Sequence, residues 1–339
     1  MTPTTTPLKN PATGVQTPAS SPSTVLGEQE ALASLRVLVS VAKADGELAP
    51  QKRTALENVF AGLELPAGAT PKSLFDEKIE LDTQLRLFTT PASCESLYQS
   101  AMGMAHVDGV CTPGEQKMLD HLRATLQISE EKASLARRIF GEARDTVLPS
   151  NLQPVNDPVR RSTEVKSDIV KYSILSSALG AFPIPGIAIA TDLAVVGVQV
   201  KMVRDIGQRW GHKVDKQAAV SLLGGLGLGT GARIAVSNLA KLVPGWGSVI
   251  GATASFTSTW ALGRVAEKYF GSGMKTDMAT LKSDFRDAQA EGRKAYDVHK
   301  ELVDSKRRLN EATLQTLGAD LTAGKVTQME YTARIEQLA

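Results

Sequence analysis

The sequence is poor in cysteine, in aromatic residues and in net charge, and each shortage excludes a class of protein. Two cysteines cannot build the disulfide framework of a small secreted domain, so we expect a reducing cytoplasm. Aromatic residues make up 5% of the chain, too few for stacking platforms that bind nucleic acid. A net charge of +2 demands no nucleic acid or acidic substrate. We also expect no secretory signal, because no basic region followed by an apolar run opens the chain.

Motifs for catalysis are missing as well. Cys94 and Cys111 have only His106 near them, which is too few ligands for a zinc site, so we interpret both as buried or half-buried thiols. His121 and His299 have no nucleophile pattern around them. We therefore expect a protein that is not an enzyme and that holds no organic cofactor.

Acidic residues are also absent from most of the third quarter of the chain, which holds three long uncharged runs. The runs are Tyr172–Thr191, Gln217–Ala232 and Leu242–Gly263. The first and third reach the length of a transmembrane helix, but Pro183 and Pro185 interrupt the first. Two interpretations stay open: helical hairpins that dip into a bilayer, which we favour, and a buried soluble bundle. The flanking basic residues suit anionic headgroups, and they are Lys166, Lys171, Lys201, Arg204, Arg209 and Lys213.

The first part of the chain changes from a polar leader to a helical domain. Residues 1–26 are rich in Thr, Pro and Ser, so we expect them to be disordered. Apolar residues recur at helical spacing from Glu28 onwards. Thr70-Pro71 and Thr90-Pro91 each combine a capping hydroxyl with Pro, which predicts helices over 71–88 and 91–107.

A repeat with an offset of 63 residues indicates an internal duplication. Ala44–Pro50 is matched by Val107–Pro113, each with an Asp-Gly turn between helices. In the second copy Thr112 and Glu115 form a capping box, and Ser129 begins a further helix. We therefore predict an all-α duplicated domain over residues 28–145.

The Asp-Gly turns allow two interpretations. Asp45, Glu47, Asp108 and Glu115 could supply hard oxygen ligands for a divalent cation such as calcium, magnesium or manganese. Alternatively, Asp-Gly is simply a good turn between helices, because Gly takes positive φ and Asp bonds backbone N–H groups. The ligand pattern of an EF-hand is not met, so we favour the turn.

The rest of the chain divides at its prolines and its charges. Residues 146–163 contain three prolines and no apolar period, which predicts a linker. Residues 166–271 predict two apolar helical hairpins with turns at Pro183–Gly186 and Val243–Gly247. Residues 274–339 predict a charged helical tail that pairs weakly and ends in a helix opened by the capping box Thr327–Glu330.

The glycine-rich run Gly224–Ala232 fits the form G-x-G-x-x-A of a dinucleotide site. The acidic residue that should follow to hold the ribose is absent, so nucleotide binding is disfavoured. Small residues spaced in this way instead predict a glycine zipper, a helix face on which two backbones approach closely. Its pairs are Gly225/Gly229, Gly227/Gly231 and Gly247/Gly251.

Residues 28–145 resemble the TerB-like domain of tellurite-resistance and related stress proteins, in Ala44–Glu47 and Val107–Gly109. The resemblance implies a compact helical domain with an acidic, metal-associated surface. Its matching positions are Asp45, Glu47, Asp108 and Glu115. Lys52 stands where the first copy would carry the acid that Glu115 supplies in the second.

Two further resemblances cover the later chain. Residues 166–271 look like the YcjF-like domain of bacterial inner-membrane and GTPase-associated proteins, in Pro183–Gly186, Met202–Gly211 and Pro244–Gly247. No GTPase motif occurs in the chain itself. Residues 314–338 are similar to the short SHOCT module, which implies oligomerisation or docking.

Together these features predict a non-enzymatic bacterial adaptor or stress-response protein. Its head would lie in the cytoplasm, and the central hairpins would hold it at the inner membrane. We expect a lipid surface and a second copy or another protein as partners, and no nucleic acid. The competing hypothesis is a membrane-perturbing or pore-forming protein that uses the Gly-rich hairpins.

Overall fold

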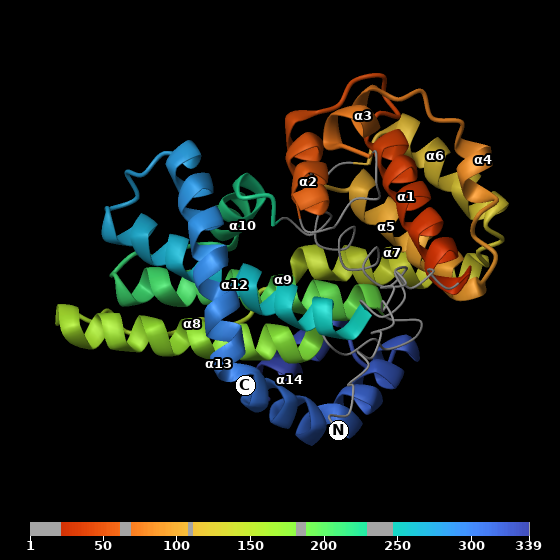
Figure 1. Ribbon diagram of the computed structural model, residues 1–339. Helices are drawn as coiled ribbons and strands as arrows, with labels where there is room; N and C mark the ends of the chain where they lie inside the picture. The colour runs from red at the N-terminus through yellow and green to blue at the C-terminus, as the bar shows by residue number, and fades with distance from the viewer. Residues whose placement is uncertain (1–21, 62–68, 108–110, 181–187, 229–246, 339) are drawn as a thin grey trace, which may run out of the picture.

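A computed structural model of the chain confirms the all-α fold (Figure 1). Helix accounts for 77% of it, and no strand occurs in the described residues. The structure describes residues 22–61, 69–107, 111–180, 188–228 and 247–338.

The N-terminal head consists of helices that surround α1. They are α1 (Pro22–Ala42), α2 (Pro50–Ala61), α3 (Pro71–Asp76), α4 (Leu81–Leu85), α5 (Pro91–Ala105), α6 (Pro113–Thr125) and α7 (Glu130–Asp145). Helix α1 packs against α2 to α6, and Leu35 and Leu38 are fully buried there. The predicted start signals are confirmed, since Thr70, Thr90 and Thr112 each accept a bond from a backbone N–H in the first turn of the helix.

Two predicted boundaries in the head are wrong. The helix expected over 71–88 is divided into α3 and α4, because side chains from α1 and from the turn that follows it hold the end of α3. Lys43 donates to the carbonyl of Phe75, and Arg36 lies 2.9 Å from Glu77, the C-cap residue. Helix α1 begins at Pro22, so the last residues of the expected leader are helical, while residues 1–21 lie outside the described chain.

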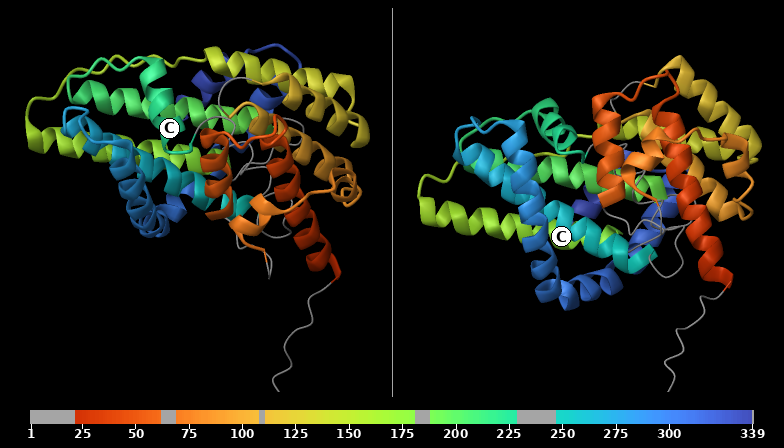
Figure 2. Two further views of the ribbon diagram at one scale, coloured as in Figure 1. Left: turned by 90° about the horizontal axis from the view of Figure 1, so that it is seen from above. Right: turned by 45° about the horizontal axis from the view of Figure 1, so that its top comes forward.

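The central block is built on three long helices that pack on one another. They are α8 (Pro158–Gly180), α9 (Ala188–Arg209) and α12 (Gly247–Gly271), joined by the shorter α10 (Lys216–Gly225). The first end of α8 points away from the head in Figures 1 and 2, and its last end lies on the side of the head. The expected hairpin turns at 183–186 and 243–246 fall outside the described residues.

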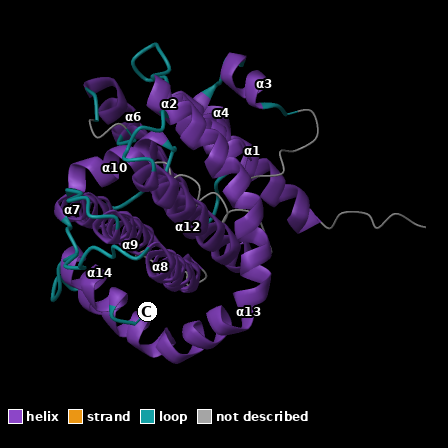
Figure 3. Cartoon of the chain, turned by 90° about the vertical axis from the view of Figure 1, so that its left-hand side faces the viewer, coloured by secondary structure: helices purple, strands orange, loops and turns teal. Residues whose placement is uncertain are grey.

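The tail returns the chain to the head. Helix α13 (Met278–Thr322) packs its first half against α12 and then curves around the bundle (Figure 3). Gly324, at φ +71°, follows its C-cap. Helix α14 (Gln328–Glu336) opens with the predicted capping box, which is confirmed, and packs against α7 and α9. The N-terminal head and the central block are therefore joined through the C-terminal helix as well as through the chain between them.

Candidate functional site

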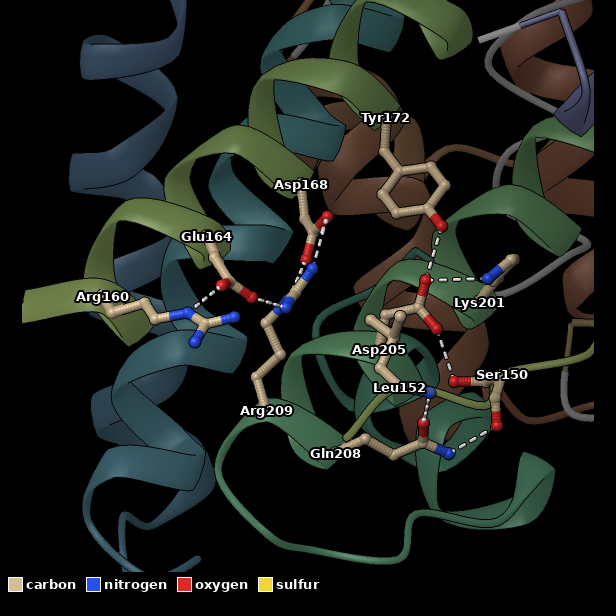
Figure 4. Close-up of polar contacts among 10 residues, drawn as sticks. All are labelled: Ser150, Leu152, Arg160, Glu164, Asp168, Tyr172, Lys201, Asp205, Gln208 and Arg209. Atoms are coloured by element: carbon tan, nitrogen blue, oxygen red, sulfur yellow. Dashed lines mark hydrogen bonds and ion pairs between the residues drawn. The ribbon is translucent and has the colours of Figure 1, made fainter. Parts of the chain in front are cut away.

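A group of residues that form polar contacts lies between α8, α9 and the segment that precedes α8 (Figure 4). Positions four residues apart lie on one face of a helix, so each helix presents a row of charged or polar groups to the other. The group consists of Ser150 and Leu152 before α8, Arg160, Glu164, Asp168 and Tyr172 on α8, and Lys201, Asp205, Gln208 and Arg209 on α9.

Asp205 is the centre of this group and is only 2% exposed. It accepts hydrogen bonds from the Tyr172 hydroxyl at 2.5 Å, from the Lys201 ammonium at 2.8 Å and from the Ser150 hydroxyl. A buried carboxylate is costly unless it is paired in this way. Burial and the Asp205 carboxylate raise the pKa of Tyr172, so its hydroxyl stays a donor. Asp205 therefore orders three segments of the chain.

Arg209 forms a second centre one turn further along α9. Its guanidinium donates to Asp168 at 2.5 Å and also to Glu164, which in turn accepts from Arg160 at 2.7 Å. Burial, together with the nearby Asp205 carboxylate, raises the pKa of Asp168 to about 6. The charges at this level are thus paired with one another.

The segment predicted to be a linker lies along α9. Gln208 accepts from the Leu152 N–H and donates to the Ser150 carbonyl, both at 2.7 Å. The Val155 N–H donates to the carbonyl of Arg209 at 3.0 Å. These bonds align the segment with α9 up to Pro158, where α8 begins. Because these polar side chains and backbone groups form hydrogen bonds with one another, they hold α8, α9 and the preceding segment together. The role that the group supports is therefore structural.

This pairing corrects the prediction about the flanking basic residues. Lys201 and Arg209 bind carboxylates inside the protein, and Arg204 donates to the carbonyls of Leu148 and Val214. These three cations are therefore used within the fold. The remaining basic residues of the set, Lys166, Lys171 and Lys213, are exposed.

The predicted metal ligands are placed differently from one another. Asp45 and Glu47 are exposed, and Asp108 lies outside the described residues. Glu115 is fully buried, 2.6 Å from the Lys52 ammonium. Lys52 thus neutralises the carboxylate that the second copy retains. The sequence shows that Lys52 stands where the first copy would carry an acid, but it does not predict the pairing of Lys52 with Glu115. No group of three or more His, Cys, Asp or Glu residues fit for a metal occurs in the described chain, and the metal site stays a prediction.

The structure does bring the two repeated turns together. Thr112, the cap of α6, donates to Asp45 at 2.9 Å. A Cβ on Gly114 would lie 2.5 Å from the same carboxylate oxygen, so glycine is required for this contact. Gly46 adopts φ +95°, as the turn interpretation requires. The first Asp-Gly turn thereby stabilises the start of the helix that follows the second.

The expected small-residue face in 224–232 is described only in part, and there a Cβ on Gly225 would lie 2.4 Å from the Met278 side chain rather than from a backbone. A Cβ on Gly224 would meet open space, and Gly227, at φ +77°, ends α10 with a bond from the Leu228 N–H to the Leu223 carbonyl. Residues 229–232 lie outside the described chain.

Close approach of backbones occurs instead between α8 and α12. A Cβ on Gly251 would lie 2.4 Å from the carbonyl oxygen of Gly180, and Ser177 donates to the carbonyl of Ala252 at 2.9 Å. The spacing of Gly247 and Gly251 predicts a close approach here, since glycine permits short distances between helices, but it does not identify Gly180 of α8 as the partner.

A cleft of about 340 Å³ opens in the head between the starts of α5 and α7. Cys94 lines it, and an ion pair between Glu95 and Lys132 crosses its rim. Burial raises the pKa of the Cys94 thiol, so the thiol stays protonated at neutral pH and is a poor nucleophile. The cleft thus offers space but no activated group.

Comparison with protein-family models, with curated proteins and with solved structures finds no match. The resemblances to the TerB-like, YcjF-like and SHOCT families therefore stay predictions. Within the described ranges, no helix combines the length and apolar character needed to cross a membrane.

Proposed function

We propose that the chain is a non-enzymatic adaptor that binds a membrane surface through one end of its central bundle and presents its head to a protein partner. The observation that carries the proposal is a separation of charge along the bundle. Every charged residue of α8 precedes Tyr172, and every charged residue of α12 follows Gly263. In α9 the first half contains only Asp192, which is buried.

The packing of the three helices aligns their uncharged halves. Gly180 meets Gly251, at the last turn of α8 and the first turns of α12. Ile169 meets Gly263, so α12 runs antiparallel to α8. The bonds from Arg209 to Glu164 and Asp168 likewise set the later half of α9 beside the earlier half of α8. At one end of the bundle, the buried Asp192 is therefore the one charged residue on these three helices.

The opposite end is charged. Arg209 joins Glu164 and Asp168 there, and Lys268 of α12 lies 2.7 Å from Asp284 of α13. Such a surface suits water, whereas an end without charges can enter the interfacial region of a bilayer at low desolvation cost.

The sequence adjoining the uncharged end fits the same role. Residues 181–187, which follow α8, are uncharged, and residues 229–246, which lead into α12, contain basic residues but no acidic one. Apolar and basic residues together favour anionic membranes. Along their length, the uncharged halves are covered by protein: residues 172–179 are all buried. The proposal therefore assigns lipid contact to the end of the bundle.

The adaptor role is supported by how the charged groups are used. Asp205, Arg209 and Glu115 are each paired with another residue of the fold, so their role is to stabilise it. The close glycine contact also lies inside the chain, between α8 and α12. This arrangement favours an adaptor over a pore assembled from glycine faces.

Liposome flotation of the full chain tests the proposal. The unmodified protein should float with vesicles of anionic phospholipid, and Ala254→Glu, at an exposed position of the uncharged half of α12, should reduce the floated fraction several-fold. Ser167→Glu is the matched control, since it adds the same charge to an exposed position in the charged half of α8. Equal loss in both variants, or no flotation of the unmodified protein, would refute membrane binding by this end. Release of an entrapped dye would instead support the pore-forming alternative.

A further inference from the structure

Helix α13 carries an exposed apolar stripe on its outer face. Val298 is 79% exposed, Leu302 46% and Leu309 75%. This part of α13 curves along the outside of the bundle in Figure 3. Large apolar side chains that stand in water on one face of a helix commonly mark an interaction surface.

The three residues lie on one face because their spacings are four and seven. The opposite face, with Tyr296, Val303 and Leu314, is buried against the protein. Ser305 and Ala312 continue the outer stripe at the same alternating spacing. The resulting seam has the period of 3.5 residues that is typical of two packed helices, and it is distinct from the inner face that packs on α12.

We propose that this seam binds the same seam of a second copy of the chain, antiparallel, about a two-fold axis beside Val303. Two-fold contacts are self-complementary, so each residue and its counterpart must fit in both directions. The antiparallel arrangement sets Val298 against Leu309 of the partner subunit, and Leu302 against the partner's Ser305. The two most exposed residues of the seam thus meet each other, and the small Ser305 lies near the centre, where the curved helices come closest.

Charge complementarity supports the direction. Glu301 and Arg308 flank the seam, are exposed, and form no ion pair with any other residue of the described chain. The antiparallel axis sets Glu301 beside Arg308 of the partner subunit, and by symmetry this pair forms twice. A parallel arrangement would instead set Glu301 opposite Lys306, whose ammonium donates to the carbonyl of Leu338 at 3.2 Å.

The size of the contact sets its expected strength. From Val298 to Leu309 the seam extends about 17 Å along the helix. A contact of this length buries less area than a standard stable interface, which implies a dimer that dissociates on dilution. The inference does not depend on membrane binding, because the seam and the uncharged end of the bundle are different surfaces.

Sedimentation velocity of the full chain over a range of concentrations tests the inference. The unmodified protein should show a monomer–dimer equilibrium. Glu301→Arg alone and Arg308→Glu alone should each raise the dimer Kd by about tenfold, because each creates two like-charge contacts. The double variant Glu301→Arg/Arg308→Glu should restore the affinity. All these positions are exposed, so circular dichroism should be unchanged.

Two further results would decide against the inference. A protein that remains monomeric at every concentration has no such dimer. Single variants that dissociate without rescue in the double variant would exclude the antiparallel pairing. Leu309→Glu should abolish the dimer, whereas Val159→Glu, at a position of α8 that is equally exposed, should leave it intact. Equal effects of these two substitutions would also contradict the proposal that the seam forms the dimer contact.

Discussion

The two halves of the central bundle are held together by different means. In the charged half, long side chains reach across between α8 and α9: Arg209 of α9 donates to Asp168 and to Glu164 of α8. In the uncharged half, α8 and α12 meet through glycine and serine with almost no side chain between them. Helix α8 is therefore joined to α9 by polar side chains at one end and to α12 by backbone proximity at the other.

This difference has a physical consequence for how each half tolerates change. Buried charges specify their partners, and losing one partner leaves the other charge uncompensated. A glycine contact has no partner to lose but has no room for an added atom. Substitutions that remove atoms should harm the charged half most, and substitutions that add atoms should harm the uncharged half.

The largest effect is expected for Asp205→Ala. It removes the acceptor for Tyr172 and the counter-charge for Lys201, so the free energy of unfolding should fall by about 3–5 kcal/mol. Urea denaturation of the full chain measures it. Asp297→Ala, an exposed position on α13, is the control and should change stability by less than about 0.5 kcal/mol. A loss of the same small size in both variants would show that the Asp205 cluster does not stabilise the bundle.

Two glycine substitutions compare the effect of an added atom at the close contact with its effect in open space. Gly251→Ala adds a Cβ that would lie 2.4 Å from the Gly180 carbonyl oxygen, and should lower the free energy of unfolding by about 1–3 kcal/mol. Gly224→Ala adds the same atom to open space in α10 and should raise it by about 0.5–1 kcal/mol. Thermal melting should therefore shift in opposite directions. Shifts in the same direction would contradict the close contact of α8 with α12.

Asp168 should make the charged half sensitive to pH. Its pKa is raised to about 6 in the folded chain, so the protonated carboxyl stabilises the fold at low pH. That contribution is complete below pH 4 and is lost as the pH rises through about 6. Asp168→Asn lacks it, so the stability of the variant relative to the unmodified protein should rise by about 2–3 kcal/mol between pH 4 and pH 7. The opposite slope would mean that the ion pair with Arg209 outweighs burial.

The smallest effect is expected for Ser177→Ala. It removes one hydrogen bond to the carbonyl of Ala252 but adds no atom, so the free energy of unfolding should fall by only about 0.5–1.5 kcal/mol. Denaturant titration beside Gly251→Ala compares the two contributions at the same interface. A loss larger than that of Gly251→Ala would show that hydrogen bonding, rather than backbone proximity, dominates this half.

Local signals of the sequence predicted much of the helical framework. Thr70, Thr90, Thr112 and Thr327 begin helices as expected, because a hydroxyl that caps a free N–H acts within one turn. Predicted helix boundaries are wrong where side chains distant in the sequence contact the end of a helix. Arg36 of α1 and Lys43, directly after α1, hold the end of α3, and no pattern within residues 71–88 reveals their positions.

Periodicity and composition in the sequence are sufficient for the all-α fold, the capped helices and the uncharged runs, because each depends on neighbours along the chain. Pairings such as Lys52 with Glu115, and Asp205 with Tyr172, depend on which helix faces meet. The spacing of small residues predicts the close approach at Gly251, but not that Gly180 of α8 is its partner. A glycine permits close approach wherever it occurs, but only the packing of α8 against α12 brings a second backbone to it.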